Sequence, residues 1–228
     1  MSVKALPPGE LCAESTLGTL RVRFFQAGDR YCHAIDLIDR DETRTLLESV
    51  EGDDAEMWPP SPPMQHLNVS RIVSDTEQRH VAMLVGGAGS SHWSMCVAVS
   101  DSENNSREAR YGAFSMELLF EVACRTQKPP VWLGNTYRIL AVPAAASEEL
   151  NCACIPTASP RCLVQTTAVK LQMEATSQPL PLLRLLAADA DVKEIDLPMT
   201  VRWRYKMRLI GSQMEEPEDH DWLLISSS

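Results

Sequence analysis

The sequence lacks a hydrophobic run long enough to cross a bilayer, and it lacks an export signal. Positions 1–14 contain no apolar stretch typical of a signal peptide, and no later stretch reaches the roughly 20 apolar residues of a membrane helix. Positive charge is also scarce, because 21 Lys and Arg stand against 31 Asp and Glu, for a formal net charge of −10. This balance argues against a surface that attracts nucleic acid or anionic membrane over its whole area, although a local basic patch remains compatible with it. We expect a cytoplasmic protein without membrane association.

Signatures of catalysis and metal binding are missing as well. The chain has no Gly-x-Ser-x-Gly, no P-loop, no dinucleotide fingerprint and no His-Glu-x-x-His. The seven cysteines show no disulfide framework, so we expect reduced thiols that act as small apolar side chains. Cys152, Cys154 and Cys162 stand close together, but their spacing differs from that of structural zinc sites. No metal and no cofactor are predicted.

The clearest pattern that is present is the alternation between Thr200 and Ile210. Hydrophobic residues occupy positions 201, 203, 205, 207 and 209, and Lys or Arg occupies 202, 204, 206 and 208. Because successive side chains of a β-strand point to opposite faces, this pattern predicts a strand with one apolar and one cationic face. A helix would spread both residue types around its circumference. We expect the rest of the fold to be organised around this strand.

Other short runs rich in β-formers recur between turn residues. The expected strands are 20–25, 31–38, 67–73, 80–85, 92–100, 136–142 and 167–175. Residues 114–125 suit a helix by composition, but their apolar residues alternate without a break, which favours a strand. Short helical segments are expected within 39–52 and 180–190.

These elements predict a mainly β fold. We expect an antiparallel β-sandwich or open barrel of about eight or nine short strands with one or two short helices. An α+β fold is the alternative if 114–125 is helical. The length and the absence of an internal repeat indicate a single domain over 1–228, with an acidic segment at 215–221 near its C-terminus.

A Pro-rich stretch at 58–63 interrupts the strand pattern, because proline lacks the N–H that a regular element uses. It could be a polyproline II segment offered to a partner. The favoured interpretation is a connection that lies flat across the domain with Trp58 as its anchor.

The most site-like residues surround a Gly-rich stretch at 86–91, which we expect to be the loop between two strands. Gly87, Gly89 and Ser90 could present backbone N–H groups to an anion, and His92 with Ser94 could form a base–nucleophile pair. No orienting carboxylate can be assigned from spacing. A flexible hairpin loop and a structural histidine explain the same residues and are the favoured interpretation.

Arg202 and Arg204 are the candidate ligand-binding residues of the cationic face. Like charges in a row repel unless anions face them. The row is therefore either a groove for an anionic ligand, such as RNA, or is neutralised by Glu117, Glu121, Glu174 or the acidic segment, and neutralisation is favoured. Trp203 and Tyr205 fall on the opposite face, which disfavours nucleic acid as a partner.

The sequence thus predicts a non-catalytic β-rich module that binds a protein or a small polar or anionic ligand. One alternative is a hydrolase or isomerase that acts on a small anionic substrate near 86–94. The other is a protein that binds RNA or an anionic ligand through 202–208. Exposed edge strands of the expected sheet are compatible with a homodimer.

Overall fold

The structure of the protein is a computed structural model. It describes twelve ranges of the chain: 9–15, 17–40, 42–53, 55–73, 78–101, 116–140, 146–147, 152–155, 161–167, 169–174, 180–187 and 197–210. Every regular element in these ranges is a β-strand. No helix capable of crossing a bilayer occurs within them.

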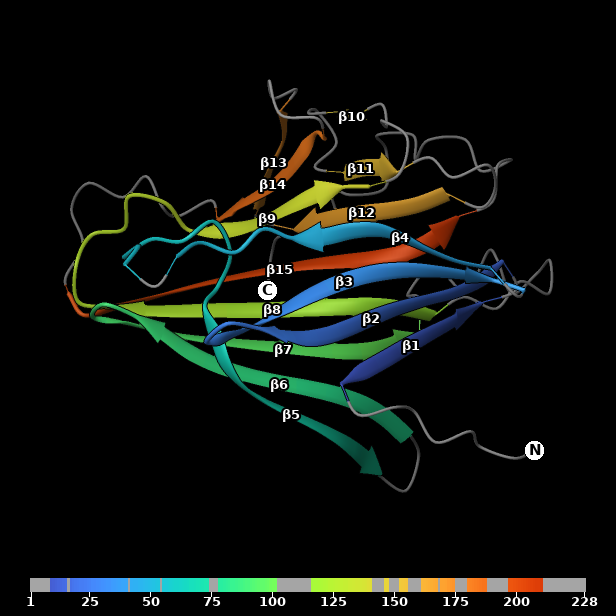
Figure 1. The fold of residues 1–228 in the computed structure, drawn as a ribbon, viewed down its shortest axis with the longest axis horizontal. Coiled ribbons are helices and arrows are strands. Elements are labelled where there is room, and N and C mark those ends of the chain that lie inside the picture. The colour runs from blue at the N-terminus through green and yellow to red at the C-terminus, as the bar shows by residue number, and fades with distance from the viewer. Residues whose placement is uncertain are drawn as a thin grey trace, which may run out of the picture.

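Fifteen strands form one continuous antiparallel sheet that folds over on itself (Figure 1). The first half contains, in spatial order, β1 (Glu10–Ser15), β2 (Gly18–Ala27), β3 (Arg30–Asp39), β4 (Glu42–Ser49), β9 (Gly134–Ile139), β14 (Leu182–Ala187) and β13 (Val169–Glu174). The second half contains β5 (Met64–Val73), β6 (Gln78–Ala88), β7 (Ser91–Asp101), β8 (Met116–Thr126), β15 (Met199–Ile210), β12 (Arg161–Thr167), β11 (Cys152–Ile155) and β10 (Ala146–Ser147).

The two halves meet along two lines. On one side β3 pairs with β5 through Tyr31 and Met64. On the other side β13 contacts β12 and β15, so the sheet is nearly closed into a barrel. Figure 1 shows β1, β2 and β3 in front of β7 and β8, and β1 contacts both of these strands. The predicted mainly β antiparallel fold is confirmed, and the α+β alternative is not, because 116–126 is strand β8.

The interior is filled by alternate residues of facing strands. The apolar row of β15 is buried as predicted: Val201, Trp203, Tyr205, Met207 and Leu209. Phe120 of β8 stacks on Tyr205 with ring centroids 4.6 Å apart, and Trp93 of β7 meets Trp203 edge-on at 6.1 Å. These large aromatic side chains carry much of the apolar area that drives folding.

The short helix expected within 39–52 is wrong, because this segment contains strand β4. Leu46 and Leu47 are consecutive and both buried, which resembles a helical face in the sequence. The register between β3 and β4 shifts between Ile35 and Asp36, so one extra residue of β4 is accommodated there. A bulge of this kind breaks the period of two and hides the strand pattern.

The short helix expected within 180–190 is also wrong. Leu182–Ala187 form β14, which lies between β9 and β13. Leu183 and Leu185 are buried, whereas Leu182 and Leu186 are half-buried, so no polar residue marks an outer face at those two positions. An apolar run with leucine on both faces fits helix and strand equally well, and pairing with two neighbours decides the outcome.

The Pro-rich stretch connects β4 in one half to β5 in the other. Pro59, Pro62 and Pro63 are buried, and Trp58 packs against the core. Ser61 Oγ donates to the carbonyl of Thr136 at 3.0 Å and accepts the Thr136 N–H at 3.2 Å. These contacts are those of a connection held against the sheet, not of an exposed polyproline segment.

The expected loop at 86–91 is shorter than predicted. β6 continues to Ala88, so only Gly89 and Ser90 connect it to β7, and Gly89 has a φ of 55°. At Gly86 a Cβ atom would lie 1.8 Å from the Pro63 carbonyl oxygen. This glycine therefore permits the close approach of the Pro-rich connection, a role that a loop interpretation misses.

Candidate functional site

The sequence-predicted site residues lie on the outer face of the second half of the sheet. His92 and Ser94 are exposed on β7, and Arg202 and Arg204 are exposed on β15. Ser94 is opposite Ala123 of β8, which in turn is opposite Arg202. Two strand spacings, or about 10 Å, therefore separate Ser94 from Arg202.

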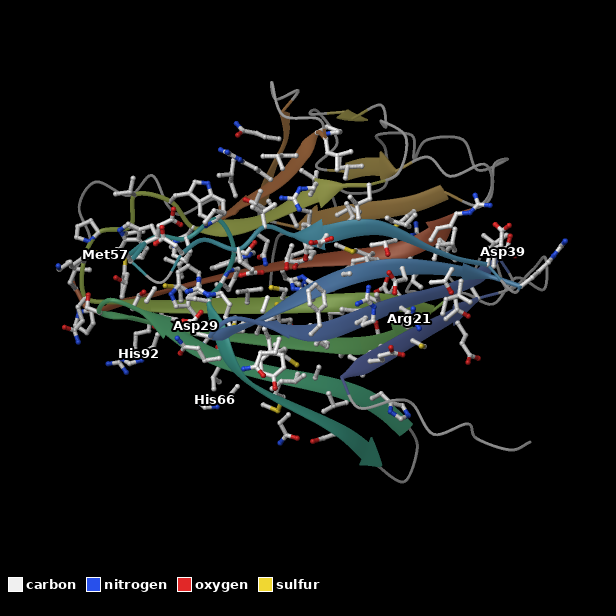
Figure 2. All side chains as sticks on the ribbon, in the orientation of Figure 1. Arg21, Asp29, Asp39, Met57, His66 and His92 are labelled. Carbon is white, nitrogen blue, oxygen red and sulfur yellow. The ribbon has the colours of Figure 1, made fainter. Side chains whose placement is uncertain are left out.

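The remaining predicted residues flank this face. Gly87 is paired with His92 and belongs to β6, while Gly89 and Ser90 form the adjoining turn. Figure 2 shows His92 extending away from the ribbon, on the same side as His66 of β5. The structure thus brings all the predicted residues to one region of the sheet.

Arg125 is a candidate site residue that was not predicted from the sequence. It is exposed on β8, directly opposite His92 and opposite Thr200 of β15. Arg202 is its diagonal neighbour, at about 7–8 Å by the usual spacing of antiparallel strands. The alternation within 114–125 could have indicated it, because Arg125 lies four residues after Glu121 and an even separation places both on the outer face of the strand. We call Arg125, Arg202 and Arg204 the arginine face.

The cationic row of β15 divides into two parts. Lys206 Nζ lies 2.9 Å from Glu117 Oε1, and Glu117 is only 4% exposed and accepts a hydrogen bond from Ser100 Oγ at 3.4 Å. Arg208 is buried next to this pair in the register. The predicted neutralisation by β8 therefore occurs at Lys206.

The arginine face itself is not neutralised within the described part of the chain. There, none of its three arginines lies within ion-pair distance of a carboxylate. Glu121 is opposite Arg204 in the register and exposed, but it makes no ion pair with a described residue. On a chain with a net charge of −10, the arginine face thus exposes three positive charges that form no ion pair with a described residue, although Glu121 lies opposite Arg204.

The arginine face is bordered by Glu121 and His92, and by small and apolar residues further across the sheet. Met83 and Val85 of β6 are 56% and 50% exposed, and the neighbouring Ala123 is half-buried. The aromatic residues of β6, β7, β8 and β15 are all buried: Trp93, Phe120, Trp203 and Tyr205. This face therefore has no Phe, Tyr or Trp side chain from these strands on which a base could stack, and His92 is its one exposed ring from them.

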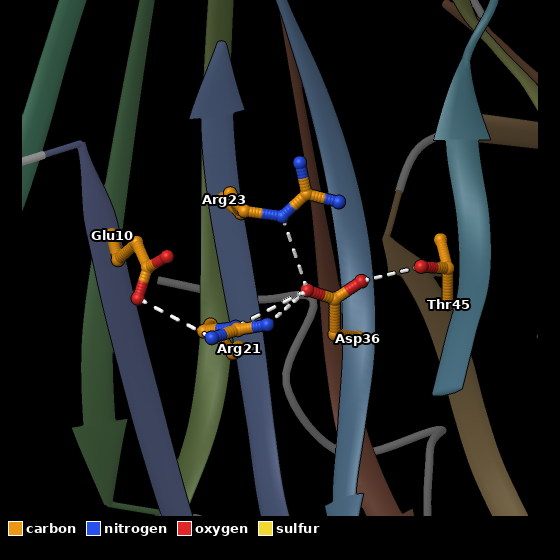
Figure 3. Close-up of polar contacts among 5 residues, drawn as sticks. All are labelled: Glu10, Arg21, Arg23, Asp36 and Thr45. Carbon is orange, nitrogen blue, oxygen red and sulfur yellow. Dashed lines mark hydrogen bonds and ion pairs between the residues drawn. The ribbon is translucent and has the colours of Figure 1, made fainter. Parts of the chain in front are cut away.

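A second group of arginines serves as a contrast (Figure 3). Asp36, 1% exposed on β3, accepts hydrogen bonds from Arg21 Nη2 at 2.7 Å, Arg23 Nε at 3.3 Å and Thr45 Oγ1 at 2.8 Å. Arg21 also reaches Glu10 at 3.5 Å. These arginines compensate a buried carboxylate, which is a structural role.

The geometry around His92 contributes no catalytic partner. Within the described ranges His92 forms no hydrogen bond to a serine or a carboxylate. Ser91 is buried, and its Oγ donates to the Ala88 carbonyl at 2.7 Å and accepts the Trp93 indole N–H at 2.9 Å. The His92–Ser94 pair stays a prediction, without an orienting acid among the described residues.

A chain of buried polar side chains crosses the core, and no pattern in the sequence indicates it. His33 Nε2 lies 2.7 Å from Tyr137 Oη, which lies 2.6 Å from Tyr205 Oη. Burial lowers the pKa of His33 to about 4 and raises the pKa values of Tyr137 and Tyr205, so all three are neutral near pH 7. Their hydrogen bonds satisfy polar atoms that would otherwise be stranded inside the barrel.

Glu51 lies beside this chain, just after β4. Ser49 Oγ donates to Glu51 Oε1 at 2.6 Å and accepts a hydrogen bond from the backbone N–H of His33 at 2.9 Å. Oε2 of Glu51 is buried without a hydrogen-bond partner among the described residues. Burial raises the pKa of Glu51 to about 7, although the Ser49 hydrogen bond and the charge of Arg30 act in the opposite direction. The carboxyl is therefore poised to titrate near neutral pH.

The cysteines at 152, 154 and 162 lie on two neighbouring strands. Cys162 of β12 is buried and opposite Ile155, and Cys152 and Cys154 of β11 are opposite Gln165 and Leu163 in the register. Among the described residues no group of three His, Cys, Asp or Glu side chains could hold a metal ion.

Comparison of the chain with protein-family models, curated proteins and solved structures finds no match.

Proposed function

We propose that this protein is a non-catalytic binding module that receives an acidic segment of a partner protein on its arginine face. One observation carries the proposal: Arg125, Arg202 and Arg204 are exposed together without a carboxylate partner in the described part of the chain. Arginine is suited to this role because its planar guanidinium binds carboxylates through two parallel hydrogen bonds.

The spacing of the arginines supports an extended acidic segment. Arg202 and Arg204 are two residues apart on β15, which is about 6.6 Å along a strand. Carboxylates on alternate residues of an extended peptide have the same spacing. Ala123 of β8 and Ser94 of β7 are next to Arg202 in the register, and their small side chains would let a peptide backbone approach the sheet.

The chemistry of the surroundings favours protein over RNA. Single-stranded nucleic acid is usually held by aromatic stacking as well as positive charge, and the Phe, Tyr and Trp residues of these strands are buried. Met83 and Val85 instead offer exposed aliphatic area on β6, about 14 Å from Arg202 across the sheet. A peptide with acidic and apolar residues would use both.

The test measures binding of a fluorescein-labelled hexaglutamate peptide by fluorescence anisotropy at low salt. The Arg202→Gln/Arg204→Gln double variant should bind about tenfold more weakly, because exposed ion pairs contribute about 0.2–1 kcal/mol each. The matched control, Arg40→Gln/Arg44→Gln, removes two exposed cations at and beside the turn between β3 and β4 and should bind like the wild type.

Two outcomes would contradict the proposal. Equal loss of affinity in both double variants would mean that the peptide responds only to net charge. Tighter binding of a labelled hexauridylate RNA than of the peptide, with the same dependence on Arg202 and Arg204, would assign the face to nucleic acid.

Raising the salt concentration should weaken the expected interaction, because exposed charges are screened.

A further inference from the structure

We infer that the arginine face is regulated from within the chain: the acidic segment, residues 215–221, binds to this face and competes with the partner. The inference rests on the proposed function, since it names what occupies the same site in the absence of a partner. The acidic segment contains Glu215, Glu216, Glu218, Asp219 and Asp221, and it lies outside the described residues.

The position of β15 restricts where the following residues can bind near it. One edge of β15 is paired with β8 along residues 199–208, and the other edge is paired with β12 along residues 204–210. Its inner face is packed in the core. A segment that reverses directly after Ile210 therefore cannot pair with residues 204–210 as a neighbouring strand, and the outer face, where Arg202 and Arg204 are exposed, is open to it.

The chain lengths match this return. Arg204 and Arg202 lie six and eight residues before Ile210, or about 20 and 26 Å along the strand. The acidic residues lie five to eleven residues after Ile210. A chain that reverses near Gly211 would bring Glu216 and Glu218 level with Arg204 and Arg202. The chain to Ser228 can extend up to about 60 Å, so reach is not limiting.

The residues after the acidic segment also complement the surface. Trp222, Leu223, Leu224 and Ile225 are apolar. Met83 and Val85 are exposed on β6, and Val85 lies three strand spacings from Arg202, or about 14 Å. Four extended residues span about this distance. An acidic stretch followed by an apolar stretch thus matches arginines followed by exposed aliphatic side chains.

Tethering makes such competition effective even when the contact is weak. A tethered segment experiences an effective concentration on the order of 1 mM, so a contact with an intrinsic Kd of about 0.1 mM would weaken external binding about tenfold. Releasing the segment should tighten binding of a peptide by the same factor.

The experiment uses the full chain and the labelled hexaglutamate peptide. One variant carries Glu216→Gln, Glu218→Gln and Asp219→Asn. The control variant carries Glu14→Gln, Asp39→Asn and Glu56→Gln, which removes three exposed carboxylates elsewhere and changes the net charge equally. We expect the first variant to bind the peptide about tenfold more tightly than the wild type, and the control to bind within about twofold of it.

The outcomes separate the two proposals. If all three proteins bind the peptide with equal affinity, the proposed function stands and the internal competition is refuted. If none of them binds, including the variant with the neutralised segment, the proposed function itself is refuted. If the difference between variant and wild type grows with protein concentration, the segment acts on a second copy, which overturns binding within one chain.

Discussion

The buried carboxyl of Glu51 gives the most quantitative prediction. Its pKa is raised from 4.5 to about 7, so the folded state binds the proton more tightly than the unfolded state does. Folding therefore loses stability as the pH rises from about 4.5 through about 7. A difference of about 2.5 pH units corresponds to about 3 kcal/mol, at about 1.4 kcal/mol per unit.

The perturbation is Glu51→Gln, which keeps an oxygen for the Ser49 hydroxyl and removes the titration. Relative to the wild type, the variant should gain about 1.4 kcal/mol of stability per pH unit between about pH 4.5 and pH 7. Urea denaturation of both proteins at several pH values gives this difference. Glu14→Gln, at an exposed position of β1, is the control for the removal of one surface carboxylate and is measured at the same pH values.

His33 produces the opposite slope. Its pKa is lowered from 6.5 to about 4, so stability is lost as the pH falls through that range, because the unfolded state takes up the proton first. In the wild type the contributions of Glu51 and His33 nearly cancel between about pH 4.5 and pH 6.5. Glu51→Gln should therefore reveal the His33 slope. A variant whose stability relative to the wild type is independent of pH would refute the burial of the Glu51 carboxyl.

Two further variants test contacts in the sheet by urea denaturation. Gly86→Ala should lower the free energy of unfolding by more than about 3 kcal/mol, because the new Cβ would lie 1.8 Å from the Pro63 carbonyl oxygen. The control is Gly87→Ala, in the same strand, which should change the free energy of unfolding by about 1 kcal/mol or less. Asp36→Asn should lower it by about 2–4 kcal/mol, because it removes the buried anion that Arg21 and Arg23 share and leaves Arg21 only its 3.5 Å contact with Glu10. A smaller loss would indicate that solvent replaces the contact.

The sequence predicted the strands in which alternation is unbroken. β15 and β8 have an apolar residue at every second position, and tertiary packing follows that period even where the composition of β8 suits a helix. The same reasoning failed for β4, where a bulge places Leu46 and Leu47 side by side in the core. It failed for β14 because leucine occurs on both of its faces.

The candidate site was predictable in part. Arg202 and Arg204 follow from the pattern of one strand, but Arg125 joins them only through the register of β8 against β15, which the sequence does not state. Long-range contacts could not be predicted either, because Tyr137 lies 104 residues from His33 and 68 residues from Tyr205 along the chain. Nothing local to those residues indicates that they meet.

The junction between β3 and β5 has a mechanical consequence. Only Tyr31 and Met64 form a backbone pair between these two strands, whereas their other neighbours are joined by long ladders. Cohesion along this line comes from side-chain packing and from the buried proline connection, which transmit force less directly than rows of amide hydrogen bonds. Under load, or on heating, the two halves would part along this seam and along the contact of β13 with β12 and β15, where the described residues form no ladder, with each half keeping its own hairpins.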